Sequence, residues 1–118
     1  EKAAIVRIEK ILHLVLGFAQ KNPGITRLLI GDVLVGETDR LRKRIDKFYE
    51  RLESQFKQVM REGEAAQELT PGKSIAARAN MLVCLIQGKL QYFVRSEFQS
   101  VPLSHWDDQW PILKQVIS

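Results

Sequence analysis

A predicted helix with two apolar faces, between Ile75 and Phe98, most constrains the fold of this chain. At about 100° per residue, one set of apolar side chains falls on one side of the helix: Ile75, Ala79, Leu82, Ile86, Leu90 and Phe93. A second set falls on roughly the opposite side: Ala77, Met81, Cys84, Leu85, Gly88 and Tyr92. A surface helix ordinarily has one apolar stripe and one solvated face, so this helix has to pack against two partners.

We predict that the second partner is another copy of the same protein. The second face would then be a dimer interface. The alternative, within one small domain, is a central helix that its own chain covers on both sides. The two alternatives differ in whether the second face is exposed in the single chain.

The remaining segments also have the 3.6-residue apolar period of helices, and none has the alternation of a strand. We expect helices over residues 2–21, 23–35, 38–62 and 72–99, and a short last helix with Ser104 as its N-cap. Asn22 is placed to cap the second helix, and Pro23 suits its first position. The 118 residues therefore predict one all-α domain of about five helices.

The core of this domain is expected to come from the apolar stripes of the first and third helices. The first stripe comprises Ala4, Ile5, Ile8, Ile11, Leu12, Val15, Phe18 and Ala19, and the third Leu41, Ile45, Phe48, Leu52, Phe56 and Val59. The lone Cys84 excludes an internal disulfide and is interpreted as a small buried hydrophobe.

Neither enzyme motifs nor metal-ligand spacings are found, so we expect no catalytic residues, metal or cofactor. His13 and His105 lie far apart in the sequence and are interpreted as surface histidines. No apolar run approaches the ~20 residues of a membrane span. The net charge of +4 suits an acidic partner without demonstrating nucleic-acid binding. The basic run Arg40, Arg42, Lys43 and Arg44 is interpreted as a solvated helix face.

One cluster on the outer face of the first helix is a candidate binding site: Arg7, Lys10, Leu14, Gly17 and Lys21. Here an exposed leucine would lie beside a glycine notch and between cations, which suits an extended peptide with acidic flanks. A glycine inside a helix often marks close approach by another backbone. The alternative is that a neighbouring helix of the same domain packs into the notch.

Several segments together resemble a known family. The first block contains Gly17-Phe18, the run from Asn22 to Arg27, and segments 39–45, 49–53 and 58–62; the second contains Phe93 to Phe98 and Trp110-Pro111-Ile112. In this order and spacing they resemble the C-terminal domain of the nucleoid occlusion factors among the tetracycline-repressor-like (TetR) transcription regulators. Lys21, where the family usually has arginine, and segments 35–38 and 63–72 depart from the pattern.

The resemblance implies a cytoplasmic, nucleoid-associated homodimer built as a four-helix bundle from the last two long helices of each subunit. The second face of the 75–98 helix would form that interface together with Trp110 and Leu113, where the small Ala77 and Gly88 allow close contact. It also implies a DNA-binding helix-turn-helix domain upstream of Glu1.

Partner binding is also implied by the resemblance. Nucleoid occlusion factors antagonise the division protein FtsZ by engaging its C-terminal tail, and the motif positions fall here on Leu14, Gly17, Lys21 and Asn22. Arg7 and Lys10 would steer acidic residues of that tail. The alternative function is a repressor domain that responds to a small-molecule inducer. Such a domain would have an internal pocket lined by Phe18, Phe48, Leu52 and Leu82.

Overall fold

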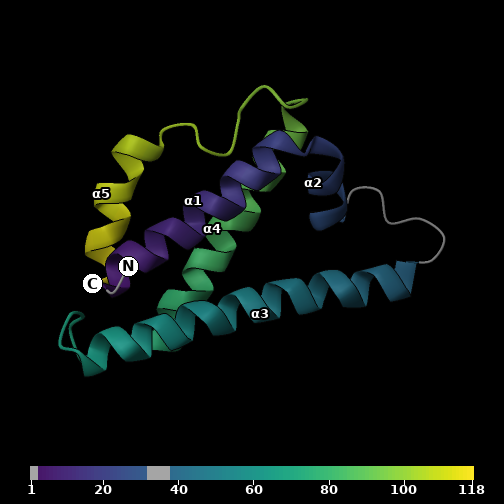
Figure 1. The fold of residues 1–118 in the computed structure, drawn as a ribbon. Coiled ribbons are helices and arrows are strands. Elements are labelled where there is room, and N and C mark those ends of the chain that lie inside the picture. Colours follow the sequence, from purple (N-terminus) through teal and green to yellow (C-terminus); the bar gives the residue numbers. More distant parts are fainter. Residues whose placement is uncertain (1–2, 32–37) are drawn as a thin grey trace.

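The computed structural model describes residues 3–31 and 38–118, and in that part of the chain it contains five α-helices and no strand. The helices are α1 (Ala4–Lys21), α2 (Pro23–Leu29), α3 (Thr38–Ala65), α4 (Ile75–Arg95) and α5 (Trp106–Ile117). Figure 1 shows α1 and α4 above the long α3. α5 lies beside the start of α1, and α2 lies at the end of α1. The all-α fold is therefore confirmed.

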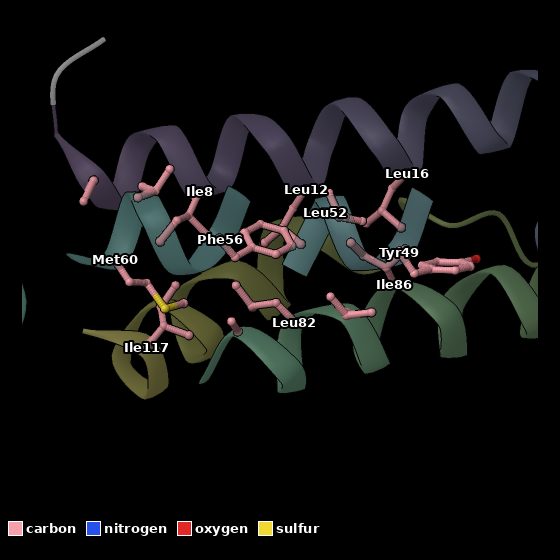
Figure 2. Packing of buried hydrophobic residues seen from close by; sticks show 14 of the residues in the cluster. Ile8, Leu12, Leu16, Tyr49, Leu52, Phe56, Met60, Leu82, Ile86 and Ile117 are labelled. Carbon is pink, nitrogen blue, oxygen red and sulfur yellow. The ribbon is translucent and has the colours of Figure 1, made fainter. Parts of the chain in front are cut away.

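The core lies where α1, α3 and α4 meet, and α5 covers one end of it. Its largest fully buried side chains are Ile8, Leu12, Leu16, Phe56, Met60, Leu82, Ile86 and Ile117 (Figure 2). Leu90 belongs to the same core, and Phe93 of α4 is also buried. The first face of α4 is thus buried as predicted, apart from the half-buried Ile75. Two residues predicted for the core are half-exposed instead, because Phe18 and Phe48 lie at the margins of their stripes.

Helix ends differ from the prediction in α2, α3 and α4. α3 continues to Ala65, and Gly63 in its last turn permits close approach of α1, since a Cβ there would lie 2.6 Å from the Cβ of Ala4. α4 begins only at Ile75, where the Ser74 hydroxyl accepts a hydrogen bond from the Ala77 N–H at 3.0 Å, and it ends at Arg95 instead of Gln99. α2 ends at Leu29 because Ile30 and Gly31 form a turn, with Gly31 at φ of 79°; residues 32–35 of the predicted helix lie outside the described residues.

The predicted N-cap of the last helix is wrong. The Ser104 N–H donates to the Val101 carbonyl in a preceding turn, so Ser104 belongs to that turn. His105 occupies the cap position in the left-handed region, with φ of 64°, and makes no side-chain cap hydrogen bond. α5 therefore begins at Trp106.

A buried arginine ties three chain segments together near the C-terminal end. Arg78 of α4 donates hydrogen bonds to the carbonyls of Ile117 at 2.5 Å, Lys73 at 3.0 Å and Ser74 at 3.3 Å. Its guanidinium also lies 4.0 Å from a Glu64 carboxylate oxygen. Arg78 therefore holds the end of α5 against the start of α4, with its charge next to α3.

Tyr49 makes the corresponding connection at the other end of the molecule. Its buried ring lies in the core, and its hydroxyl donates to the Leu29 carbonyl at the end of α2, 3.0 Å away. Burial raises the pKa of Tyr49 to about 12, so the phenol keeps its proton at neutral pH. This bond fixes the end of α2 to the N-terminal half of α3.

Candidate interaction surfaces

The outer face of α1 presents an exposed leucine between two lysines. Leu14 is 73% exposed, and Lys10 and Lys21 are exposed on the same side of the helix. A leucine exposed on this scale is covered by nothing in the described part of the chain. Leu14, Lys10 and Lys21 therefore form a surface that is apolar at its centre and basic at its ends.

The glycine notch beside this surface is partly occupied by the chain itself. A Cβ built at Gly17 would lie 3.8 Å from the Leu103 side chain, in the connection between α4 and α5. The side-chain oxygen Oε1 of Gln20 accepts a hydrogen bond from the Leu103 N–H at 3.2 Å, which holds the connection in place. An element of the same domain thus packs at one flank of the notch, but it is a loop and not the helix named as the alternative.

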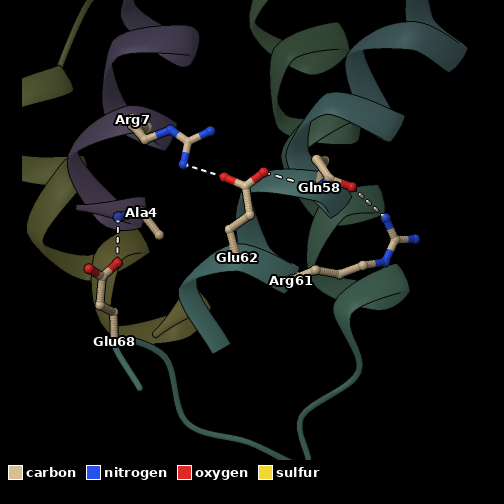
Figure 3. A network of polar contacts seen from close by, with 6 residues as sticks. All are labelled: Ala4, Arg7, Gln58, Arg61, Glu62 and Glu68. Carbon is tan, nitrogen blue, oxygen red and sulfur yellow. Dashed lines mark hydrogen bonds and ion pairs between the residues drawn. The ribbon is translucent and has the colours of Figure 1, made fainter. Parts of the chain in front are cut away.

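Arg7 contributes less to this surface than predicted, because its charge is already paired. Its guanidinium donates to the Glu62 carboxylate of α3 at 2.6 Å, and Gln58 donates to the other Glu62 oxygen at 2.9 Å (Figure 3). The hydrogen bond from Gln58 lowers the pKa of Glu62 most, and the hydrogen bond from Arg7 lowers it next. Nearby, a Glu68 carboxylate oxygen accepts from the Ala4 N–H at 2.8 Å (Figure 3). These contacts fix the start of α1 to the region around the end of α3.

Asn22 ends α1 and occupies the N-cap position of α2, as predicted, but it makes no side-chain cap hydrogen bond. Its side-chain amide donates to the Phe18 carbonyl at 2.8 Å instead, so the amide satisfies a free carbonyl of the preceding helix. The buried Thr26 hydroxyl completes this corner, because its one proton is shared between the Ala19 carbonyl at 2.8 Å and the Asn22 carbonyl at 2.9 Å.

The second apolar face of α4 is exposed in the single chain. Met81 is 52% and Tyr92 54% exposed, and Ala77, Cys84 and Gly88 are exposed beside them, with Leu85 partly buried. The alternative that the protein's own helices cover this face is therefore wrong for the part of the chain that is described. The interpretation of Cys84 as buried is also wrong in the single chain, since it lies on this outer face.

The two residues of α5 predicted for the dimer interface face the core in the single chain. Trp110 and Leu113 pack against the core, and the Trp110 ring stacks on Trp106 with centroids 5.8 Å apart. They share an inward stripe with the buried Trp106 and Ile117. The outward apolar residues of α5 are Ile112, 66% exposed, and the half-exposed Val116, which were not predicted for the interface.

A groove of about 390 Å³ runs between α4 and the connection that follows it. Its lining includes Gly88, Tyr92, Val101 and His105. Beneath it, the Lys89 ammonium donates to the Gln109 side chain at 2.6 Å, and burial lowers the pKa of Lys89. The groove thus continues the exposed face of α4 toward α5.

Within the described residues, the four side chains predicted to line an inducer pocket do not face one cavity. Leu52 and Leu82 are buried in the packed core, whereas Phe18 and Phe48 are half-exposed, so these four do not line one enclosed cavity. Among the described residues, no group of three or more histidine, cysteine or acidic side chains could hold a metal ion. Within the same residues, no helix has the length and apolarity needed to cross a bilayer.

Comparisons with known proteins agree with the all-α fold and show the family. Residues 2–118 match the SlmA-like family described as "Tetracyclin repressor-like, C-terminal domain". The nucleoid occlusion factor SlmA of Marinomonas sp. (strain MWYL1) is 50% identical over 115 residues, which cover 98% of this chain and 58% of that protein. The SlmA of Alteromonas mediterranea is 49% identical over 116 residues, 98% of this chain and 60% of its own length. The chain spans about three-fifths of these relatives.

Proposed function

The chain belongs to the SlmA-like family of tetracycline-repressor-like C-terminal domains, and on that premise we propose that it dimerises and binds a partner within a nucleoid occlusion factor. The observation that carries the proposal is the exposed apolar face of α4, continued by Ile112 and Val116 of α5. Two helices of each subunit would then form a four-helix bundle across a two-fold axis. DNA binding is assigned to a helix-turn-helix domain upstream of Glu1.

The size of the uncovered surface supports a second copy as its cover. Met81, Tyr92 and Ile112 are large apolar side chains, each more than half exposed on neighbouring helices. Monomeric soluble proteins seldom expose contiguous apolar patches of this kind, and association removes their surface from water. The small Ala77 and Gly88 leave room for a helix to approach α4 closely.

Replacing Gly88 with leucine tests the dimer. A Cβ at Gly88 meets nothing within 4 Å, so the single chain accommodates a larger side chain there. In a dimer the added leucine overpacks the helix contact, at a cost of about 1–3 kcal/mol. We expect sedimentation velocity to show a monomer fraction that grows on dilution, while circular dichroism keeps its helical amplitude.

Gly24→Leu is the matched control, because a Cβ at Gly24 also meets nothing within 4 Å and Gly24 lies in the first turn of α2, outside the residues of α4's second face. This variant should sediment like the wild type. If Gly88→Leu has the same dimer affinity as Gly24→Leu, the outer face of α4 is not the interface.

The partner assigned to the outer face of α1 is the acidic C-terminal tail of FtsZ. Leu14 supplies the apolar contact, and Lys10 and Lys21 attract acidic residues of the tail. Arg7 is left out of this site because Glu62 already pairs with it. Gly17 and Asn22 lie at the edge of the same surface, next to the Leu103 loop and the α1–α2 corner respectively.

A Leu14→Glu variant should lose tail binding, since it removes the apolar contact and repels the acidic peptide. The measurement is fluorescence polarisation with a labelled FtsZ C-terminal tail peptide, and we expect affinity to fall by at least about tenfold, or 1.4 kcal/mol. Ser54→Glu, an equal charge change at an exposed position on α3, serves as control. Equal affinities of the two variants would contradict the assignment.

A further inference from the structure

The positive charge of the chain is concentrated in one stretch of α3. Residues 40–51 contain six lysines and arginines but only two acidic residues, a net charge of +4. The whole chain has the same net charge, so the remaining residues are balanced. The interpretation of Arg40 to Arg44 as a solvated helix face does not account for this concentration of positive charge.

Four of these cations lie on a single face of the helix. At 100° per residue, Lys43, Arg44, Lys47 and Arg51 fall within about 100° of one another, opposite the buried Leu52 and Phe56. All four are exposed. We call these four residues the basic stripe. In Figure 1 this half of α3 extends past α4, on the side of the molecule away from α5.

Helix stability does not explain the basic stripe. Lys43 and Lys47, and then Lys47 and Arg51, are like charges at i,i+4 spacing, which destabilises a helix, whereas Asp46 and Glu50 place opposite charges at i,i+3 from Lys43 and Lys47. Ion pairs within α3 are formed on either side of the stripe, by Asp39 with Arg42 and by Glu53 with Lys57, each at 3.9 Å.

Nor does pairing inside the domain explain it. Among the described residues, no carboxylate oxygen lies within 4.0 Å of a side-chain nitrogen of the stripe. Asp46 and Glu50 lie along one side of the stripe, and Glu50 shares the outer surface with Lys47 and Arg51, but neither carboxylate forms an ion pair with the four cations. Four cations therefore face solvent beside two carboxylates, and an external polyanion would relieve the repulsion that remains.

The geometry of the stripe favours duplex DNA. Lys43 to Arg51 covers about 12 Å of a straight helix, the rise of about three to four phosphates along one strand. The outer face continues with the hydrogen-bonding side chains of Ser54 and Gln58 and with Arg61. No apolar side chain lies between the cations, as insertion into a membrane surface would need. We propose that the basic stripe of α3 binds the phosphate backbone of DNA without sequence preference.

This contact differs from recognition by a helix-turn-helix domain, because it belongs to the 118-residue chain itself. The test is fluorescence anisotropy of this chain with a labelled duplex of arbitrary sequence. If all four cations contact phosphates, the slope of log K against log salt is about −3.6. We expect Lys47→Gln/Arg51→Gln to reduce the magnitude of that slope by about 1.8 and weaken binding at least tenfold at low salt.

Lys73→Gln/Lys114→Gln is the matched control, since it removes two exposed cations outside the stripe and lowers the net charge equally. It should change the affinity by less than about twofold. The thermal midpoint of Lys47→Gln/Arg51→Gln should equal or exceed that of the wild type, because the substitutions remove like-charge repulsion. A loss of DNA binding by Lys47→Gln/Arg51→Gln would then not result from unfolding.

Three outcomes would overturn the proposal: no DNA binding by the wild type, equal weakening in the two double variants, or a salt slope near zero. Vesicles of zwitterionic lipid with a minority of anionic lipid provide the other polyanionic surface. We expect them to leave the chain in the supernatant on centrifugation. Vesicle binding that requires Lys47 and Arg51, without DNA binding, would assign the stripe to membranes and contradict the proposal.

Discussion

Replacing Arg78 with alanine should lower the free energy of unfolding by about 3 kcal/mol, because it removes a buried donor that three carbonyls share. The Ile117, Lys73 and Ser74 carbonyls lose this partner together, and Glu64 loses the nearby positive charge. One hydrogen bond still joins the chain after α5 to the segment before α4, because the Thr70 N–H donates to the Ser118 carbonyl at 2.8 Å. Urea unfolding followed by circular dichroism measures the loss.

Arg95→Ala is the comparison for this prediction. Arg95 is also an arginine of α4, but it is exposed and stacks over the Tyr92 ring at 4.7 Å. Its replacement should change stability by no more than about 0.5 kcal/mol, as for most surface substitutions. Arg78→Lys should recover only part of the loss, because lysine lacks the planar fork that reaches several carbonyls. All variants are compared at one protein concentration, since dimerisation would add to apparent stability. Equal losses in Arg78→Ala and Arg95→Ala would contradict the role assigned to Arg78.

A charge at Met81 should have the largest effect on assembly. Met81 is 52% exposed in the single chain, so a glutamate there stays solvated in a monomer and folding is preserved. In the proposed dimer, two such carboxylates would enter an apolar interface, where burial of an unpaired charge is costly. We expect the dimer dissociation constant to rise at least about 100-fold, or 2.7 kcal/mol.

Gln87→Glu provides the control for Met81→Glu on the same helix. Gln87 is exposed but lies on a polar stripe of α4, outside the second apolar face. Sedimentation equilibrium should give Gln87→Glu a dissociation constant within about threefold of the wild type. If Met81→Glu has the same dissociation constant as Gln87→Glu, the second apolar face of α4 is not the dimer interface.

Much of the fold could be predicted from the sequence because the apolar stripes are regular. In the α1 stripe, Ala4, Ile8, Leu12 and Ala19 are buried as the 3.6-residue period predicts, and Leu16, which the predicted stripe left out, is buried as well. In α3, Leu52, Phe56 and Val59 are buried as predicted. The stripe margins were less predictable. Phe18 and Phe48 lie at the edge of the contact between helices, and periodicity gives no information about how far a neighbouring helix extends.

The candidate surfaces could be predicted only in part. The exposure of Leu14 and of the second face of α4 follows from helix geometry and is confirmed. The pairing of Arg7 with Glu62 and the packing of Leu103 beside Gly17 join residues 55 and 86 positions apart, and no local pattern indicates them. On α5, both Trp110 and Ile112 are apolar, and only the tertiary structure shows which one faces outward.

The buried role of Arg78 was missed for a similar reason. In the sequence it is one charged residue on a narrow polar stripe of α4. Its hydrogen bond to Ile117 spans 39 residues, and burial follows from the end of α5 closing over it. A charged side chain with few charged neighbours inside an apolar helix is the one signal that could have indicated such a contact.

Sedimentation equilibrium of the wild-type chain tests the central claim most directly, namely that a second copy covers the outer face of α4. The account predicts a species with twice the 13.6 kDa mass of the chain, which dissociates on dilution and in the Gly88→Leu and Met81→Glu variants. A 13.6 kDa monomer at all concentrations up to about 100 μM, a dissociation free energy weaker than about 5.5 kcal/mol, would contradict it.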